Sequence, residues 1–320
     1  MGLVNKLEQL SKYSTVVADT GAIEDIKLYA PQDATTNPSL LLKAAQIDDY
    51  KYIFEKSVKP YISKSIDIHL ASIIMDIAVG FGVEILEIIP GRVSTEVDAR
   101  LSFDTKKTIE YAKEIINKYH TFGVDRDRVL IKIAATWEGI MAASELEKSG
   151  IHCNLTLIFN KVQAIASANS RASLVSPFVG RVTDWYMKKN NLSNFPEVDI
   201  DPGVYSVKDI YRYFKFFGYD TMIMGASFRH ILQVEALAGC DALTISPGLL
   251  KKLESNYNPL SNVLKGEIYH TNLVQIDTSK QNFEFLMKED IMAYEKLAEG
   301  IKQFSVDTLK LESLVKDRLR

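Results

Sequence analysis

The feature that most constrains the fold is a regular alternation of short strand-like runs with helical stretches. Eight runs are apolar or alternating and rich in β-branched residues, which is typical of strands. They cover residues 15–20, 33–39, 92–97, 129–133, 153–159, 174–179, 221–227 and 242–246. Their number and their alternation with helices predict an α/β fold, a (β/α)8 TIM barrel with additional N- and C-terminal helices.

Helical periodicity fills most of the intervals between these runs. The predicted helices cover residues 5–12, 40–45, 50–61, 66–79, 105–119, 137–148, 161–169, 207–217 and 231–238. A bare barrel needs about 250 residues, so we assign residues 1–320 to a single TIM-barrel domain with a helical C-terminal extension over about 250–320. A doubly wound open sheet is the alternative, less favoured because no Gly-rich dinucleotide turn follows the first strand.

Charge and composition restrict the partners and the compartment. The net charge is −3 and no basic block is present, which argues against binding to nucleic acid or to an anionic membrane. Residues 1–10 carry charges and lack the apolar core of a signal peptide, and no apolar run is expected to approach a membrane-spanning length. Cys153 and Cys240 are expected to be small core residues. We therefore expect a cytoplasmic protein.

One cation, Lys132, interrupts the apolar strand of residues 129–133. Side chains alternate between the faces of a strand, so Lys132 shares its face with Leu130 and Ala134. If helices cover the opposite face, Lys132 points into the barrel, where desolvation lowers the pKa of a lysine. A neutral amine can form a Schiff base with a carbonyl substrate. The alternative, commoner for a lone lysine, is a head group that extends to solvent.

Polar side chains recur at the C-terminal ends of the predicted strands, where barrels of this type carry their active sites. They are Asp19, Asn37, Ser94, Glu96, Asn154, Thr156 and Ser176. Each has a simpler explanation alone, such as a helix cap at Asp19, a turn at Asn37 or an ion pair between Glu96 and Arg100. An unpaired buried polar group costs about 1–3 kcal/mol, so the whole set around one lysine indicates a functional site.

Two arginines follow late strands, Arg181 after Gly180 and Arg229 after Gly225. Phosphate sites in this fold commonly lie at the ends of late strands, and arginine binds phosphate through paired N–H donors. The alternative is two surface arginines in loops. The pattern predicts a phosphorylated substrate.

No cofactor is expected. The five histidines, His69, His120, His152, His230 and His270, lack metal-ligand spacing. The pair Gly80 and Gly82 lacks the third glycine of a dinucleotide loop and is expected to lie between helical pieces. A nucleophile-elbow motif is also absent from the sequence.

At these residues the sequence resembles the transaldolase family. The resemblance runs in order from about Val17 to Pro247 and includes several long motifs. They are Val17-Ala-Asp-Thr-Gly21, Gln32-Asp-Ala-Thr-Thr-Asn-Pro-Ser39, Pro90-Gly-Arg-Val-Ser-Thr-Glu-Val-Asp-Ala-Arg100, Ile131-Lys-Ile133, Thr136-Trp-Glu-Gly-Ile140, Asn154-Leu-Thr-Leu157, Ser176-Pro-Phe-Val-Gly-Arg181 and Met224-Gly-Ala-Ser-Phe-Arg229.

This resemblance implies an enzyme of the non-oxidative pentose phosphate pathway that works through a Schiff base. It would transfer a dihydroxyacetone unit from sedoheptulose 7-phosphate or fructose 6-phosphate to glyceraldehyde 3-phosphate or erythrose 4-phosphate. Lys132 matches the Schiff-base lysine of the family. Glu96, with Thr156, matches the group that moves protons through a water, and Asp19 matches the acid/base that takes the C4 hydroxyl proton.

The resemblance also implies the substrate contacts. The residues that match those holding the dihydroxyacetone hydroxyls are Asn37, Asn154 and Ser176. The residues that match the phosphate grip are Arg181, Ser227 and Arg229. In the related fructose 6-phosphate aldolases a tyrosine stands at the position of Phe178, whose apolar ring would hold a catalytic water less well and so favour transfer over release of free dihydroxyacetone.

The sequence departs from the family at Ala135, where relatives often have serine, and at residues 168–172, where the family has a small stretch ending in glycine. Two other functions remain open at this point. One is a Schiff-base aldolase that releases dihydroxyacetone, and the other is a non-catalytic barrel that binds sugar phosphates. Family members are often dimeric, and a homodimer extends to this chain by analogy only.

Overall fold

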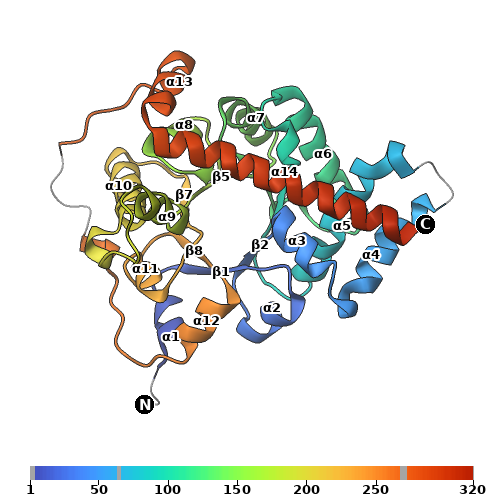
Figure 1. Ribbon diagram of the computed structural model, residues 1–320, viewed down its shortest axis with the longest axis horizontal. Helices are drawn as coiled ribbons and strands as arrows, with labels where there is room; N and C mark the ends of the chain where they lie inside the picture. The colour runs from blue at the N-terminus through green and yellow to red at the C-terminus, as the bar shows by residue number, and fades with distance from the viewer. Residues whose placement is uncertain (1–3, 63–65, 267–271, 320) are drawn as a thin grey trace.

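A computed structural model of the protein describes residues 4–62, 66–266 and 272–319. Eight parallel strands close into a barrel in the order β1 to β8, with each strand paired to the next and β1 paired to β8 (Figure 1). The strands are β1 (Thr15–Asp19), β2 (Asp33–Thr35), β3 (Val93–Glu96), β4 (Val129–Ala134), β5 (Cys153–Ile158), β6 (Leu174–Pro177), β7 (Met222–Gly225) and β8 (Ala242–Ile245). The predicted (β/α)8 barrel is confirmed, and the open-sheet alternative is wrong.

Helices surround the strands and extend past them at both ends of the chain (Figure 1). They are α1 (Lys6–Leu10), α2 (Ile23–Tyr29), α3 (Pro38–Ala44), α4 (Lys51–Val58), α5 (Ile66–Leu86), α6 (Thr105–Thr121), α7 (Trp137–Lys148), α8 (Lys161–Asn169), α9 (Gly180–Lys189), α10 (Pro202–Phe217), α11 (Ile231–Glu235), α12 (Pro247–Glu254), α13 (Lys280–Glu289) and α14 (Ile291–Leu319). The sequence did not predict α2 and α9. Neither has a side chain that caps its N-terminus, so the usual start signal is absent.

The faces of β4 are divided as the alternation predicts. Leu130 belongs to the small apolar cluster inside the barrel, together with Val17 of β1 and Leu174 of β6. Ile131 and Ile133 belong instead to the large core between the strands and the surrounding helices. This division fixes the direction of Lys132, which shares the inward face with Leu130.

Strand β5 is not the regular strand that the sequence suggests. Leu157 has a φ of 56°, and the register with β6 shifts between Leu155 and Ile158, which marks a bulge. The buried Gln163 side chain of α8 donates to the Leu157 carbonyl at 3.0 Å and accepts from the Phe159 N–H at 2.9 Å. The ladder bonds lost at the bulge are therefore replaced by one amide side chain.

Helix α5 corrects two expectations. It continues past Val79 to Leu86, so Gly80 and Gly82 lie inside a helix and not between helical pieces. Its segment His69–Leu86 has 18 residues with a mean hydropathy of 1.7, enough by composition to cross a membrane, contrary to the expectation from sequence. This segment is 61% buried inside the protein, where α4, α6 and β3 pack against α5. A helix covered on several sides is apolar on most of its surface.

The contact between α5 and α6 gives a prediction for stability. A Cβ atom on Gly82 would lie 1.7 Å from Tyr119 Oη, which is buried and bonded to Thr95 Oγ1 at 2.5 Å. We expect Gly82→Ala to lower the free energy of unfolding by about 1–3 kcal/mol through overpacking. Urea unfolding checks this. Gly248→Ala is the matched control, because no atom lies within 4 Å of its added Cβ, and it should unfold at an unchanged or higher midpoint.

The last helix closes one side of the barrel mouth. Helix α14 passes in front of the strands from α13 toward α4 and α5 (Figure 1), and it contacts α3, α9 and β5. Its polar contacts with the rest of the protein include one from Ser39 to Asp307 at 2.5 Å and one from Arg100 to Glu312 at 2.7 Å. The helical C-terminal extension therefore reaches the end of the barrel at which Asp19 and Lys132 lie.

Candidate active site

A cavity of about 260 Å³ opens at the C-terminal ends of the strands. The predicted site residues that line it are Asp19, Asn37, Lys132, Thr156, Ser176, Phe178, Arg181, Ser227 and Arg229. Two further predicted residues, Glu96 and Asn154, lie directly behind this lining, bonded or paired to residues that form it. The structure therefore brings all eleven predicted residues together.

Lys132 lies at the centre of the polar contacts. It is 5% exposed, and its Nζ is 3.1 Å from the Thr36 carbonyl oxygen and 3.3 Å from Glu96 Oε2. Glu96, Lys132 and Asn154 are direct neighbours across β3, β4 and β5, because the parallel register pairs Glu96 with Lys132 and Lys132 with Asn154. Glu96 does not pair with Arg100, which binds Asp98 and Glu312 instead. The simpler explanation of Glu96, an ion pair with Arg100, is therefore wrong.

The two carboxyl groups of the site are shifted in the same direction. Burial raises the pKa of Asp19 above its ordinary value, while Lys132 and the Thr35 hydroxyl oppose the rise. Burial likewise raises the pKa of Glu96, while Lys132 opposes it. Asp19 accepts from Thr35 Oγ1 at 3.2 Å and does not cap a helix. Both groups hold a proton more readily than carboxyls in water, as groups that exchange protons near neutral pH require.

Two buried oxygen atoms of the site have no hydrogen-bond partner among the described residues. They are Thr156 Oγ1 and Glu96 Oε2, the latter within ion-pair distance of Lys132 but outside hydrogen-bond geometry. An unsatisfied buried polar atom is costly, so such atoms mark places where a water or ligand group binds. A water bound to these two oxygens fits the proton-transfer role expected of Glu96 and Thr156.

Ser176 and Asn154 belong to one hydrogen-bonded chain, whereas Asn37 caps a helix. Ser176 Oγ donates to Asn154 Oδ1 at 2.6 Å, and Asn154 Nδ2 donates to Ser94 Oγ at 3.1 Å, which forms a chain across three strands. Asn154 is completely buried behind Ser176. Asn37 caps α3 by accepting from the Leu40 N–H at 3.0 Å, and it also lines the cavity. For Asn37 the structural and the functional explanation are both supported.

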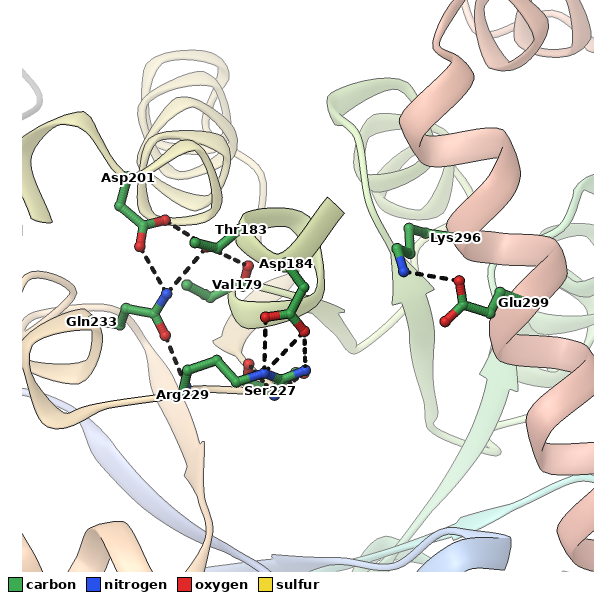
Figure 2. Close-up of polar contacts among 9 residues, drawn as sticks. All are labelled: Val179, Thr183, Asp184, Asp201, Ser227, Arg229, Gln233, Lys296 and Glu299. Atoms are coloured by element: carbon green, nitrogen blue, oxygen red, sulfur yellow. Dashed lines mark hydrogen bonds and ion pairs between the residues drawn. The ribbon is translucent and has the colours of Figure 1, made fainter. Parts of the chain in front are cut away.

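Arg181, Ser227 and Arg229 form the cationic part of the cavity. Arg229 Nη2 pairs with Asp184 Oδ2 at 2.7 Å, and its Nη1 donates to Ser227 Oγ at 3.3 Å (Figure 2). Ser227 has a φ of 62°, a conformation uncommon for a residue other than glycine. Arg181 is half-buried and is not a surface arginine, and its burial and the neighbouring Arg229 lower its pKa.

A buried polar network fixes the backbone beside Arg229 (Figure 2). The Gln233 side chain accepts from the Arg229 N–H at 2.8 Å and donates to Asp201 Oδ2 at 2.8 Å. Asp201 also accepts from Thr183 Oγ1 at 2.7 Å and caps α10 through the Gly203 N–H at 2.8 Å. The network joins α9, α10 and α11, so helix α9, which carries Arg181, and the loop that carries Arg229 are fixed to each other.

Several lining residues were not predicted from the sequence. They are Thr35, Met224, Ala226, Phe228, Thr244, Ser246 and Phe304. Thr35 and Thr244 are bonded to each other at 3.0 Å, and they lie at the C-terminal ends of β2 and β8. The predicted strands, residues 33–39 and 242–246, continued past both threonines, so the rule that selected Asp19 did not select them. Phe304 comes from α14, far along the chain, and it has no local signal.

The departures from the family lie outside the cavity lining. Ala135 is fully buried, and its backbone bonds to Thr156 and Gln163. Arg171, in the altered stretch 168–172, has a φ of 64°, a backbone conformation that glycine adopts with the least steric strain. Among the residues that the structure describes, which exclude His270, no three His, Cys, Asp or Glu side chains are grouped to hold a metal ion.

Comparisons with known proteins agree with this geometry. A family model described as Transaldolase/Fructose-6-phosphate aldolase matches residues 16–315. A protein named "Probable transaldolase" from Drosophila melanogaster is 49% identical over 320 residues, which cover 98% of this chain and 96% of that protein. A solved flavocytochrome b2 variant with sulfite bound is aligned over 92% of this chain and 65% of its own, at 10% identity and a TM-score of 0.38, too low to carry an argument. The chain belongs to the transaldolase/fructose-6-phosphate aldolase family.

Proposed function

We propose that the protein is a transaldolase that transfers a dihydroxyacetone unit between ketose phosphates and aldose phosphates. The donors are sedoheptulose 7-phosphate and fructose 6-phosphate, and the acceptors are glyceraldehyde 3-phosphate and erythrose 4-phosphate. Family membership and the near-full-length relative support the activity. The observation that carries it is the buried Lys132 amine, which lies with Asp19 in the same cavity as Arg181 and Arg229.

The first half of the reaction uses the groups around Lys132. Its amine attacks the ketose carbonyl carbon, one proton passes from the nitrogen to the former carbonyl oxygen, and a second proton comes from the Glu96 carboxyl through a water held by Thr156. The oxygen then leaves as water and an iminium remains, with Glu96 as the carboxylate. Burial raises the pKa of Glu96, so this carboxyl carries a proton more readily than a carboxyl in water. Ser176 and Asn37 line the cavity where the dihydroxyacetone hydroxyls would bind.

Cleavage then uses Asp19. Its carboxylate takes the proton of the C4 hydroxyl, the bond between C3 and C4 breaks, and the electron pair moves into the iminium to leave an enamine on Lys132. The aldose phosphate leaves, and an acceptor aldehyde reacts by the reverse sequence. The raised pKa of Asp19 suits a group that takes and returns a proton in each cycle.

A second candidate function is an aldolase that releases free dihydroxyacetone, since the family includes both activities. Release requires a proton to reach the enamine from water. Phe178, which lines the cavity and is 7% exposed, offers an apolar ring with no hydroxyl to hold that water. We therefore favour transfer, and assays with and without an acceptor aldehyde separate the two.

The pH dependence follows from the environment of Asp19. Its base form is lost as pH falls through its pKa, and burial raises that pKa from 3.8, so kcat/KM should fall with decreasing pH above the ordinary carboxyl range. The Thr35 hydroxyl opposes this rise through its hydrogen bond to Asp19. Thr35→Val should therefore move the acid limb, the low-pH fall of kcat/KM, to higher pH. Thr244→Val, which removes a hydroxyl bonded to Thr35 and not to Asp19, is the control. An acid limb that stays in place in Thr35→Val contradicts this assignment.

Borohydride reduction in the presence of fructose 6-phosphate, followed by peptide mapping, tests the function. We expect a reduced three-carbon adduct on Lys132, since cleavage leaves the dihydroxyacetone unit on the amine. Folded protein that binds the sugar phosphate but gives no adduct on Lys132 would leave only a sugar-phosphate-binding barrel.

We further propose a cytoplasmic location, a homodimer and one barrel domain over residues 1–320. The closure of all eight strands into one barrel supports the single domain. The location repeats the expectation from charge and composition, and the homodimer rests on analogy with the family. Size-exclusion chromatography with light scattering tests the dimer.

A further inference from the structure

The two arginines of the cationic site are held in different ways. Arg229 has a carboxylate partner in Asp184, as Figure 2 shows. Arg181 has none within ion-pair distance among the residues that the structure describes. Its guanidinium carbon lies 5.0 Å from the ring centroid of Phe178 and 5.7 Å from that of Phe304. Both distances fall within the roughly 6 Å reach of a cation–π interaction.

Phe304 is a fixed part of the cavity wall. It is 2% exposed and lines the cavity from α14. One turn earlier, a Cβ on Gly300 would lie 2.7 Å from Leu157 Cδ2 and 3.4 Å from Arg181 Nη1, so the helix backbone approaches both closely. This part of α14 is therefore packed directly against the bulge of β5 and against Arg181.

Polar contacts on both sides of Phe304 hold α14 in register. On the N-terminal side, Trp185 Nε1 of α9 donates to Glu295 at 2.7 Å. On the C-terminal side, Ser39 of α3 donates to Asp307 at 2.5 Å. Because both ends of this stretch are bonded to the barrel, the Phe304 ring has a defined position relative to Arg181.

An aromatic partner affects Arg181 differently from a carboxylate. Arg181 and Arg229 are neighbouring cations, and their repulsion and the burial of Arg181 disfavour the charge. The negative face of a ring offsets part of this cost without neutralising the charge. It also leaves the five N–H donors of the guanidinium available for an anion, whereas a carboxylate would compete for them.

We propose that Phe304 is a positioning residue that orients the Arg181 guanidinium for the substrate phosphate. In this way α14 sets the preference of the site for phosphorylated over unphosphorylated sugars. The inference rests on the proposed function in one respect, namely that Arg181 binds the phosphate of the ketose or aldose.

The sharpest test keeps the shape of the ring and changes its charge distribution. Phenylalanines with an increasing number of fluorines, incorporated at position 304, weaken the negative face stepwise while the packing stays nearly constant. Phe283 is the matched control, because it is 4% exposed, packs with its ring tilted by 52° to that of Trp137 and does not line the cavity. The same series at position 283 should leave all binding constants unchanged.

Two constants report on the phosphate grip. With full fluorination at position 304, the KM for fructose 6-phosphate and the inhibition constant of inorganic phosphate should each rise roughly tenfold, the equivalent of a lost desolvated cation–π contact. The kcat, and kcat/KM for unphosphorylated fructose, should stay within about twofold. Equal changes at positions 304 and 283, or no change at 304, would overturn the proposal.

A conventional variant gives an independent readout. Phe304→Leu removes the ring face and should weaken phosphate inhibition, while Phe304→Tyr keeps the face and should retain it. If Phe304→Leu does not fold, the fluorinated series decides alone. The dissociation constant of inorganic phosphate, measured by titration calorimetry, does not depend on turnover. If the wild-type protein traps no Schiff base but fluorination at position 304 still weakens phosphate binding, the transaldolase function is refuted and the role of Phe304 stands.

Discussion

Replacing Lys132 with methionine is expected to lower kcat by at least about 10⁴-fold, because Lys132 is the only amine among the described residues that line the cavity. Methionine keeps the length and apolar stem of the lysine, so the barrel interior stays filled. The variant should still bind inorganic phosphate, since Arg181 and Arg229 are untouched. Borohydride should give no adduct with fructose 6-phosphate.

The control for this variant is a second buried lysine that takes no part in the site. Lys6 is 6% exposed and pairs with Glu235 at 2.6 Å, away from the cavity. Lys6→Met should lower the unfolding midpoint, because it leaves Glu235 without its ion-pair partner. It should leave kcat nearly unchanged, because it does not alter the residues that line the cavity. Turnover of Lys132→Met within tenfold of the wild type would exclude the Schiff-base mechanism at this residue.

Replacing Asp19 with asparagine should separate Schiff-base formation from cleavage. The amine, Glu96 and Thr156 remain, so the ketose can still condense with Lys132. Loss of the base that accepts the C4 hydroxyl proton should lower kcat by about 10²–10⁴-fold. Borohydride should then trap a six-carbon adduct of fructose 6-phosphate on Lys132, in contrast to the three-carbon adduct of the wild type.

Asp33→Asn provides the comparison for this variant. Asp33 also belongs to a strand of the barrel, but it accepts from the Arg92 N–H at 2.8 Å at the start of β2 and does not line the cavity. Its replacement should change stability and leave the three-carbon adduct in place. A three-carbon adduct in Asp19→Asn at the wild-type rate would assign the proton transfer to another group.

The parts of the fold that the sequence predicted are those set by local rules. The two-residue alternation of β4 placed Lys132 on one face with Leu130 and Ala134, and the closed barrel makes the face of Leu130 the inner one. The same rule placed Ser94 and Glu96 on one face of their strand, whereas the pairing of Glu96 with Lys132 depends on the register between β3 and β4, which the sequence did not predict. The C-terminal ends of the strands then brought the polar residues into one cavity.

Features that depend on distant contacts were not predicted. The bulge at Leu157 depends on the Gln163 amide, which compensates for the broken ladder, and nothing in the strand itself signals it. Helix α9 begins without a capping side chain, so its start had no sequence signal. Phe304 reaches the cavity only because α14 crosses the mouth, and a chain position so far from β6 carries no local sign of contact with Arg181.

The position of α14 has a consequence for synthesis. The strands of the barrel are complete at Ile245, whereas the helix that carries Phe304 spans Ile291–Leu319. Because a chain emerges from the ribosome N-terminus first, a nascent protein can close its barrel and assemble Lys132, Glu96 and Asp19 before the phosphate grip is finished. The residues that react with a carbonyl group can therefore be in place before the helix proposed to favour phosphorylated sugars has been synthesised.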